Sequence, residues 1–200
     1  MDEITAQQEI AFIKKIMQDS RRIVYSDGME FIYWGSIVVI CLLFTYFSVY
    51  WNTERYIFYF WTAFLLLGFL GNTFFLQKRY KKLKVKSFAG NILSVIWVAA
   101  GTAMLIVGFV GPLSNAYDGV FISPLISTIL GTAYLLTGYI YGKKWVSYLS
   151  AFWWAGAIVM FIWPGLYTIL LMAGMMILLQ IIPGIILYKD SEREFAQTEQ

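Results

Sequence analysis

The side chains that could do chemistry inside this chain are almost all neutral. His, the commonest general base and metal ligand, is absent, and Cys41 is the only cysteine. No Asp, Glu, Lys or Arg lies well inside a long apolar segment, although membrane enzymes and proton-coupled transporters usually keep such groups there. No phosphate-binding glycine loop, zinc-protease helix or serine-nucleophile motif occurs. The sequence therefore predicts a protein that is not an enzyme and that holds no cofactor or metal.

Five residues in the apolar segments could instead line a path for a small neutral or apolar molecule. Four of them carry an amide or hydroxyl group. The fifth is a proline, which is predicted to free the carbonyl of Leu179 by removing its N–H donor and to kink the helix. They are Asn72, Thr128, Thr132, Gln180 and Pro183. Because amides and hydroxyls also bond neighbouring helices to one another in membranes, structural hydrogen bonding is the favoured interpretation of each.

Two aromatic residues, Trp153 and Trp154, fall in the middle of an apolar segment, away from the interfacial positions that tryptophan prefers. They either fill space against glycines or form the wall of an apolar cavity. We favour packing.

A glycine pattern occurs twice, as GTAMLIVG at 101–108 and as GTAYLLTG at 131–138. Glycines seven residues apart lie on one side of a helix, where they allow a second helix to approach closely. We expect a close antiparallel helix contact centred on Gly101 and Gly131. The predicted helix-packing residues are Gly101, Gly108, Gly131, Gly138 and Gly142.

The elements that carry these residues are predicted to be transmembrane helices. Hydrophobic residues make up 60% of the 200 residues and charged residues 14%, against about 45–50% and about 25% in soluble domains. A helix needs about 20 apolar residues to cross the hydrocarbon core. The predicted fold is an all-α integral membrane protein with six transmembrane helices in a bundle over 29–188. The six spans are 31–51, 57–77, 92–111, 124–141, 145–163 and 166–188.

Basic residues predict how these spans are threaded. Of the 15 Lys and Arg residues, all except Arg55 flank segments that would lie on one side. Since Lys and Arg concentrate in cytoplasmic loops, both termini are predicted to be cytoplasmic, in a cell (cytoplasmic) membrane. The segment 1–28 is predicted to be a cytoplasmic amphipathic helix and turn, and 189–200 a cytoplasmic tail.

The loop 78–86 concentrates positive charge next to the membrane. Such residues attract anionic lipid at about 1 kcal/mol each near the surface, and they also determine topology. Topology is the first interpretation, contact with anionic lipid is compatible with it, and nucleic-acid binding is disfavoured. The candidate lipid contacts are Lys78, Arg79, Lys81, Lys82, Lys84 and Lys86.

The N-terminal run Ile13…Met17…Ser20-Arg21…Gly28…Gly35 resembles uncharacterised bacterial multi-pass inner-membrane proteins. In those proteins a short cytoplasmic helix with Met, Ser and Arg precedes a first span with an early glycine. The resemblance covers about forty residues. It implies no activity and no catalytic residue.

The sequence therefore predicts one of two functions, and a membrane-embedded enzyme is a distant third. The first is a non-enzymatic regulatory or scaffold module whose cytoplasmic face meets a protein partner, a second copy of the chain or anionic lipid. The second is a channel or facilitator for a small neutral or apolar molecule. We favour the first, because charge is concentrated at the cytoplasmic face and the apolar segments have none.

Overall fold

A computed structural model of the chain describes residues 28–73 and 88–198, and all the regular elements in these two ranges are helices. Long apolar runs form helices because a helix satisfies its own backbone without water. The longer helices are α2 (Met29–Tyr50), α3 (Ile57–Gly71), α5 (Phe88–Leu105), α7 (Ile122–Tyr141), α8 (Lys144–Ile162), α9 (Tyr167–Met176) and α10 (Ile182–Thr198). The short elements are η1 (Glu54–Tyr56), α6 (Gly111–Leu113), η4 (Gly119–Phe121) and the π-helical turns η3 (Ile106–Val110) and η5 (Ile177–Ile181).

Five helical stretches are long and apolar enough to cross a membrane. They are Met29–Tyr50, Ala89–Leu113, Gly119–Tyr141, Lys144–Ile162 and Tyr167–Arg193. They coincide with five of the six predicted spans, so the all-helical architecture is confirmed. The predicted span 57–77 coincides with α3, which has 15 residues, and its last part lies outside the described residues. The sixth span therefore stays a prediction.

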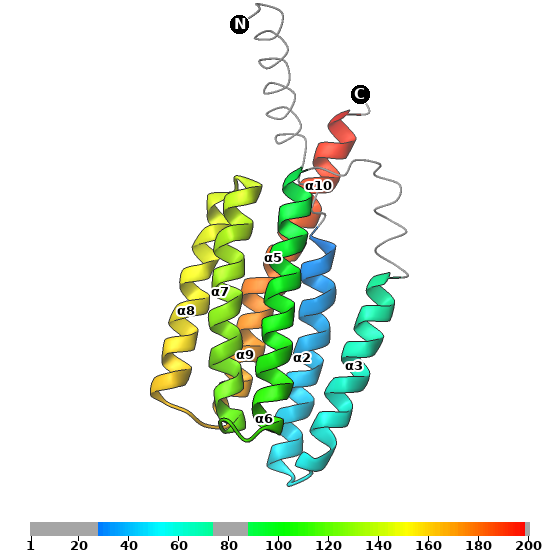
Figure 1. Ribbon diagram of the computed structural model, residues 1–200. Coiled ribbons are helices and arrows are strands. Elements are labelled where there is room, and N and C mark those ends of the chain that lie inside the picture. The colour runs from blue at the N-terminus through cyan, green and yellow to red at the C-terminus, as the bar shows by residue number, and fades with distance from the viewer. Residues whose placement is uncertain (1–27, 74–87, 199–200) are drawn as a thin grey trace, which may run out of the picture.

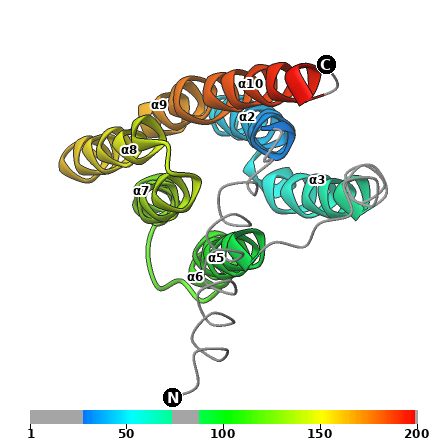
Figure 2. The same cartoon turned by 90° about the horizontal axis from the view of Figure 1, so that it is seen from above.

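The helices form an upright bundle with α2, α9 and α10 packed together (Figure 1). The view from above shows how the helices are arranged (Figure 2). One row runs from α8 through α9 to α10, with α2 beside α10 and α3 next to α2. The helices α7 and α5 lie across from this row. The most extensive contact is between the antiparallel helices α7 and α8. The beginning of α2, the α7–α8 connection and α10 lie at the same end of the bundle (Figure 1).

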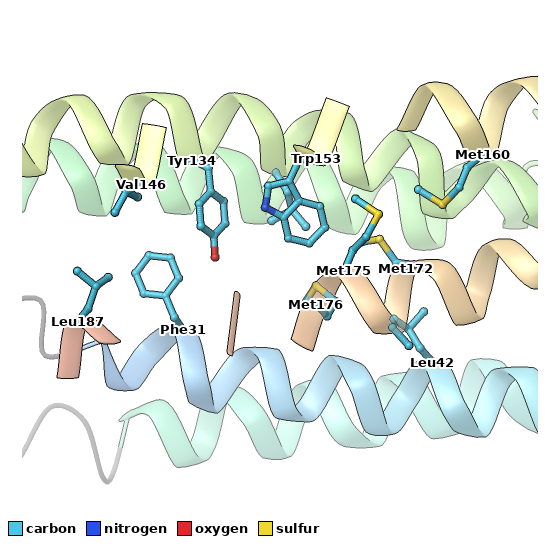
Figure 3. Packing of buried hydrophobic residues seen from close by; sticks show 12 residues of the cluster. Phe31, Leu42, Tyr134, Val146, Trp153, Met160, Met172, Met175, Met176 and Leu187 are labelled. Carbon is cyan, nitrogen blue, oxygen red and sulfur yellow. The ribbon is translucent and has the colours of Figure 1, made fainter. Parts of the chain in front are cut away.

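The core of the bundle is built from large aromatic and sulfur-containing side chains. Trp153 of α8 and Tyr134 of α7 are its largest fully buried side chains. Methionines of α8 and α9 fill the space beside Trp153, as flexible thioethers do in irregular cores (Figure 3). The core lies between α7 and α8 on one side and α2 and α9 on the other.

The last span bends around a π-helical turn. Pro183 was predicted to free the carbonyl of Leu179 and kink the helix. In the structure the Ile182 N–H bonds the carbonyl of Ile177, five residues back, in η5. Pro183 follows this turn after one residue and has no N–H to donate, so the freed Leu179 carbonyl stays a prediction.

The two predicted segments that flank the bundle compare with the structure as follows. The amphipathic helix at 1–28 lies, apart from Gly28, outside the described residues. The predicted tail at 189–200 is, up to Thr198, a helical continuation of α10.

Candidate functional site

Four aromatic rings from four helices meet in the interior of the bundle. Phe31 of α2 lies edge-on to Trp97 of α5 and to Tyr134 of α7, with ring centroids 5.4 and 5.5 Å apart. The Tyr134 ring is 5.9 Å from both Trp97 and Trp153. These are the separations at which aromatic pairs are favourable. We call Phe31, Trp97, Tyr134 and Trp153 the aromatic cluster.

Two polar atoms of the aromatic cluster have no hydrogen-bond partner among the described residues. They are the hydroxyl of Tyr134 and the indole Nε1 of Trp153. Tyr134 is 1% exposed and Trp153 is fully buried, so surrounding solvent does not reach these atoms. Figure 3 shows the Tyr134 hydroxyl pointing toward the side of α2, where the Phe31 ring lies, and the Trp153 nitrogen on the side of its indole that faces Tyr134.

A third unpartnered atom comes from the π-helical turn η5. Gln180 is 4% exposed, and its Nε2 donates a long hydrogen bond of 3.5 Å to the carbonyl of Phe31. Its Oε1 accepts no hydrogen bond from the described part of the chain. The bond to Phe31 places the amide beside the aromatic cluster, on the residue that also contacts Tyr134.

A glycine on α2, Gly35, allows η5 to come this close. A Cβ on Gly35 would lie 2.7 Å from Cγ1 of Ile181 and 3.4 Å from Cγ of Gln180. A larger side chain would push η5 away and withdraw the amide from Phe31. Gly35 therefore positions Gln180.

Trp153 is positioned by the α7–α8 interface. The hydroxyl of Ser127 on α7 donates a 2.7 Å hydrogen bond to the Trp153 carbonyl. The neighbouring Trp154 covers Gly131, where an added Cβ would lie 2.4 Å from its indole ring, and donates to the Thr128 carbonyl at 3.3 Å. The expected packing of Trp154 against a glycine is thus confirmed.

Only part of the predicted glycine contact exists. Gly131 and Gly138 both face α8, and a Cβ on Gly138 would lie 2.2 Å from the backbone nitrogen of Ser147. Gly101 and Gly108 have no atom within 4 Å of an added Cβ, so the predicted Gly101–Gly131 contact is wrong. The physical reason is that α8, the antiparallel neighbour joined to α7 by a short turn, takes the glycine face of α7.

Gly142 has a role other than helix packing. An added Cβ there would meet no atom within 4 Å, but φ is +64°, a left-handed conformation that side chains disfavour. The following N–H, of Lys143, bonds back to the carbonyl of Gly138 at 3.1 Å. Gly142 is therefore the C-terminal cap of α7, and its predicted packing role is wrong.

The structure does not bring the five predicted path residues together. Thr128 and Thr132 lie exposed on the outer face of α7, and each hydroxyl bonds a carbonyl of its own helix four residues back. Asn72 follows α3, which packs against α2. Gln180 and Pro183 are buried. The predicted path through Thr128 and Thr132 is therefore wrong, because these hydroxyls face away from the core.

Sequence reasoning missed Tyr134, although a signal for it was present. Ser127, Leu130, Gly131, Tyr134 and Gly138 recur at spacings of three and four residues and are all buried on one face of α7. Thr128 and Thr132 fall between these positions. Applying the helical period to α7 would have selected Tyr134.

Charged residues gather at the end of the bundle where α2 begins. Lys143, in the α7–α8 turn, forms a 3.0 Å ion pair with Asp190 of α10. Within the two described ranges no group of three His, Cys, Asp or Glu residues could hold a metal ion. The candidate lipid contacts of the loop 78–86 lie outside the described residues.

At the same end α2 and α10 touch through their backbones. A Cβ on Gly28 would lie 2.0 Å from the carbonyl oxygen of Gly184, and one on Gly184 would lie 2.9 Å from Cβ of Phe31. Gly28 has a φ of +65°, so it turns the chain into α2 in a conformation suited to glycine. We call this contact between Gly28 and Gly184 the glycine junction.

Comparisons with known proteins give this chain no relative: no protein-family model, no curated protein and no solved structure matches it.

Proposed function

We propose that the protein is a non-enzymatic multi-pass protein of the cell membrane that acts as a regulatory or scaffold module through its cytoplasmic face. The six-span topology with both termini in the cytoplasm is part of the proposal. The observation that carries it is the segregation of charge: the five apolar helical stretches have an uncharged interior, and basic residues gather at one end.

The described basic residues support this orientation. Lys143 and Lys144 lie at the α7–α8 connection, and Lys189 and Arg193 lie on α10, at the same end of the bundle (Figure 1). Arg55, between α2 and α3, lies at the opposite end. Positive residues favour the cytoplasmic side, so the end with the α7–α8 connection faces the cytoplasm in this proposal.

The glycine junction gives this face a fixed geometry. Because Gly28 contacts the backbone of Gly184, the chain enters α2 directly beside α10. The basic residues Lys189 and Arg193 lie on this same helix. A partner or an anionic lipid surface would meet the start of α2 and the basic part of α10 together.

The second candidate, a facilitator for a small neutral molecule, is favoured by one observation. Buried polar atoms of Tyr134, Trp153 and Gln180 lack partners in the described ranges. Against it, Trp153 and Tyr134 fill the centre of the bundle with large rings, and the predicted path residues are not assembled. Flux of a neutral solute such as glycerol into protein-containing vesicles, above that of empty vesicles, would support the facilitator.

The regulatory proposal is tested by removing the cytoplasmic elements one at a time. One variant lacks residues 1–24, and a second carries Gln at Lys143, Lys144, Lys189 and Arg193. Each is purified from native membranes, and co-purifying proteins and anionic lipids are quantified by mass spectrometry. The Arg55→Gln variant is the matched control, since it neutralises the opposite end.

We expect both cytoplasmic variants to lose specific partners or anionic lipid, and Arg55→Gln to keep them. If the deletion and the quadruple variant retained the same proteins and lipids as the unmodified chain, the proposal would be wrong. Thermal unfolding of each variant separates a lost contact from a lost fold.

A further inference from the structure

We infer that the interior of the bundle binds a small neutral molecule through a hydroxyl group, held by Tyr134, Trp153 and Gln180. This site is independent of the proposed cytoplasmic function. It rests on three buried polar atoms, from α7, α8 and η5, that have no partner among the described residues.

The three atoms match the hydrogen-bonding capacity of one hydroxyl oxygen. The Trp153 indole can only donate, and the Tyr134 hydroxyl can donate or accept. The Gln180 Nε2 already donates to the Phe31 carbonyl, which leaves Oε1 as an acceptor. A hydroxyl group accepts two hydrogen bonds and donates one, so it satisfies two donors and one acceptor at once.

The position of these atoms makes an unsatisfied state costly. Trp153 lies at the middle of α8, and Tyr134 and Gln180 lie well inside their apolar stretches. At this depth bulk water is absent, and a polar atom left without a partner is unfavourable. In the inferred site one bound hydroxyl group lies within reach of all three atoms and supplies the missing partner of each.

The walls of the site indicate the rest of the ligand. The side chains next to the three atoms are apolar: the rings of Phe31, Trp97, Tyr134 and Trp153 contact one another, and methionines of α9 lie beside Trp153 (Figure 3). These surfaces favour a compact apolar or flat body and offer no charged partner. The hydroxyl group therefore belongs to a small alcohol or phenol, or, where the body is absent, to a single water molecule.

Two near-isosteric variants distinguish an occupied site from an empty one. Tyr134→Phe removes one donor. Gln180→Met removes the acceptor with little change in volume, and it also removes the long Nε2 bond to the Phe31 carbonyl. If a hydroxyl group is bound, each variant deprives it of a bond, and the melting temperature in detergent should fall by about 2–4 °C. The double variant should lose less than the sum, because both changes act on the same bound molecule.

An empty site predicts the opposite sign. Removing an unsatisfied buried polar group is neutral or stabilising, so an unchanged or raised melting temperature in both variants would overturn the inference. Tyr139→Phe, which removes an exposed hydroxyl of the same helix, is the matched control and should change nothing. Because Gln180→Met also loses the bond to the Phe31 carbonyl, its fall supports the inference only when Tyr134→Phe falls as well.

A second measurement separates the two sources of the hydroxyl group. Phenol and toluene have similar size, and only phenol can bond the three atoms. A rise in melting temperature with phenol beyond that with toluene, lost in Tyr134→Phe, identifies an organic hydroxyl compound. Equal responses to phenol and toluene, together with destabilised variants, identify bound water.

Discussion

The two copies of the glycine pattern allow a matched test of helix packing, because their local sequences are nearly the same and their surroundings differ. Gly101 and Gly131 each begin a Gly-Thr-Ala segment within a helix. An added methyl group meets nothing within 4 Å at Gly101. At Gly131 it would lie 2.4 Å from Cδ1 and Nε1 of Trp154. Gly101→Ala and Gly131→Ala therefore share one local effect and differ in one contact.

The shared effect is stabilising. Replacing glycine by alanine inside a helix gains about 0.5–1 kcal/mol, mostly from the lower entropy of the unfolded backbone. With no clash, Gly101→Ala should raise the free energy of unfolding by up to about 1 kcal/mol. Such a gain in the free energy of unfolding would mean that Gly101 does not serve close helix packing.

The contact at Gly131 reverses the sign. Overpacking costs about 1–3 kcal/mol, and moving the Trp154 indole also endangers its bond to the Thr128 carbonyl, at about 1 kcal/mol. After the gain from helix propensity, Gly131→Ala should lose about 1–3 kcal/mol. Gly138→Ala should lose more, because its methyl group would meet the Ser147 backbone nitrogen, which cannot rotate away.

The chain carries its own probe for this series. Cys41 is its only cysteine and is 0% exposed on α2, so a maleimide should label it only when the bundle opens. Labelling is followed as denaturant rises, with thermal unfolding as a second measure. The order of stability should be Gly101→Ala, unmodified chain, Gly131→Ala, Gly138→Ala. Equal losses at Gly101 and Gly131, or a gain at Gly131, would refute the assignment of the α7 glycine face to α8.

Three further substitutions test other contacts. Gly28→Ala should destabilise the fold by more than about 1 kcal/mol, because its positive φ disfavours a side chain and the methyl group would meet a backbone oxygen of α10; an unchanged melting temperature would contradict the glycine junction. Tyr117→Phe should lose about 1–3 kcal/mol, since the Tyr117 hydroxyl donates to the Val107 carbonyl, and thermal unfolding measures this loss. Lys143→Gln should lower the free energy of unfolding by less than about 1 kcal/mol, because both side chains of its ion pair with Asp190 are about one-third exposed. The loss should be smaller at high salt, which screens exposed charges. A loss that does not depend on salt would contradict a screened pair.

Composition and hydropathy predicted the helical class and most helix positions, because the bilayer restricts a long apolar segment to a helix. The predicted spans 124–141 and 145–163 differ from α7 (Ile122–Tyr141) and α8 (Lys144–Ile162) by at most two residues at any end. Such boundaries follow from turn residues and charges, which are local in the sequence. The tight α7–α8 connection begins at Gly142, a residue suited to its left-handed conformation.

The partners of each helix face could not be predicted in this way. Gly101 and Gly131 are both followed by Thr-Ala, yet Gly131 is covered by Trp154 and Gly101 by nothing within 4 Å. What decides the difference is the order of helices around the bundle, which no local pattern encodes. For the same reason Tyr134 and Gln180, far apart in the chain, could be recognised as neighbours of Phe31 only from the structure.

The two π-helical turns show how proline changes the faces of a helix beyond it. Each turn is followed after one residue by a proline, Pro112 or Pro183, whose missing N–H leaves a carbonyl of the turn without a backbone donor. At the first, the Tyr117 hydroxyl supplies the missing donor. A π turn holds one extra residue, which rotates every later side chain by about 100° relative to an unbroken helix. If the buried face of α9 is extended into α10 at the regular helical period, the residues predicted to be buried beyond η5 are therefore wrong. That rotation is what turns the start of α10 toward the start of α2 and leaves Gln180, within the turn, facing the aromatic cluster.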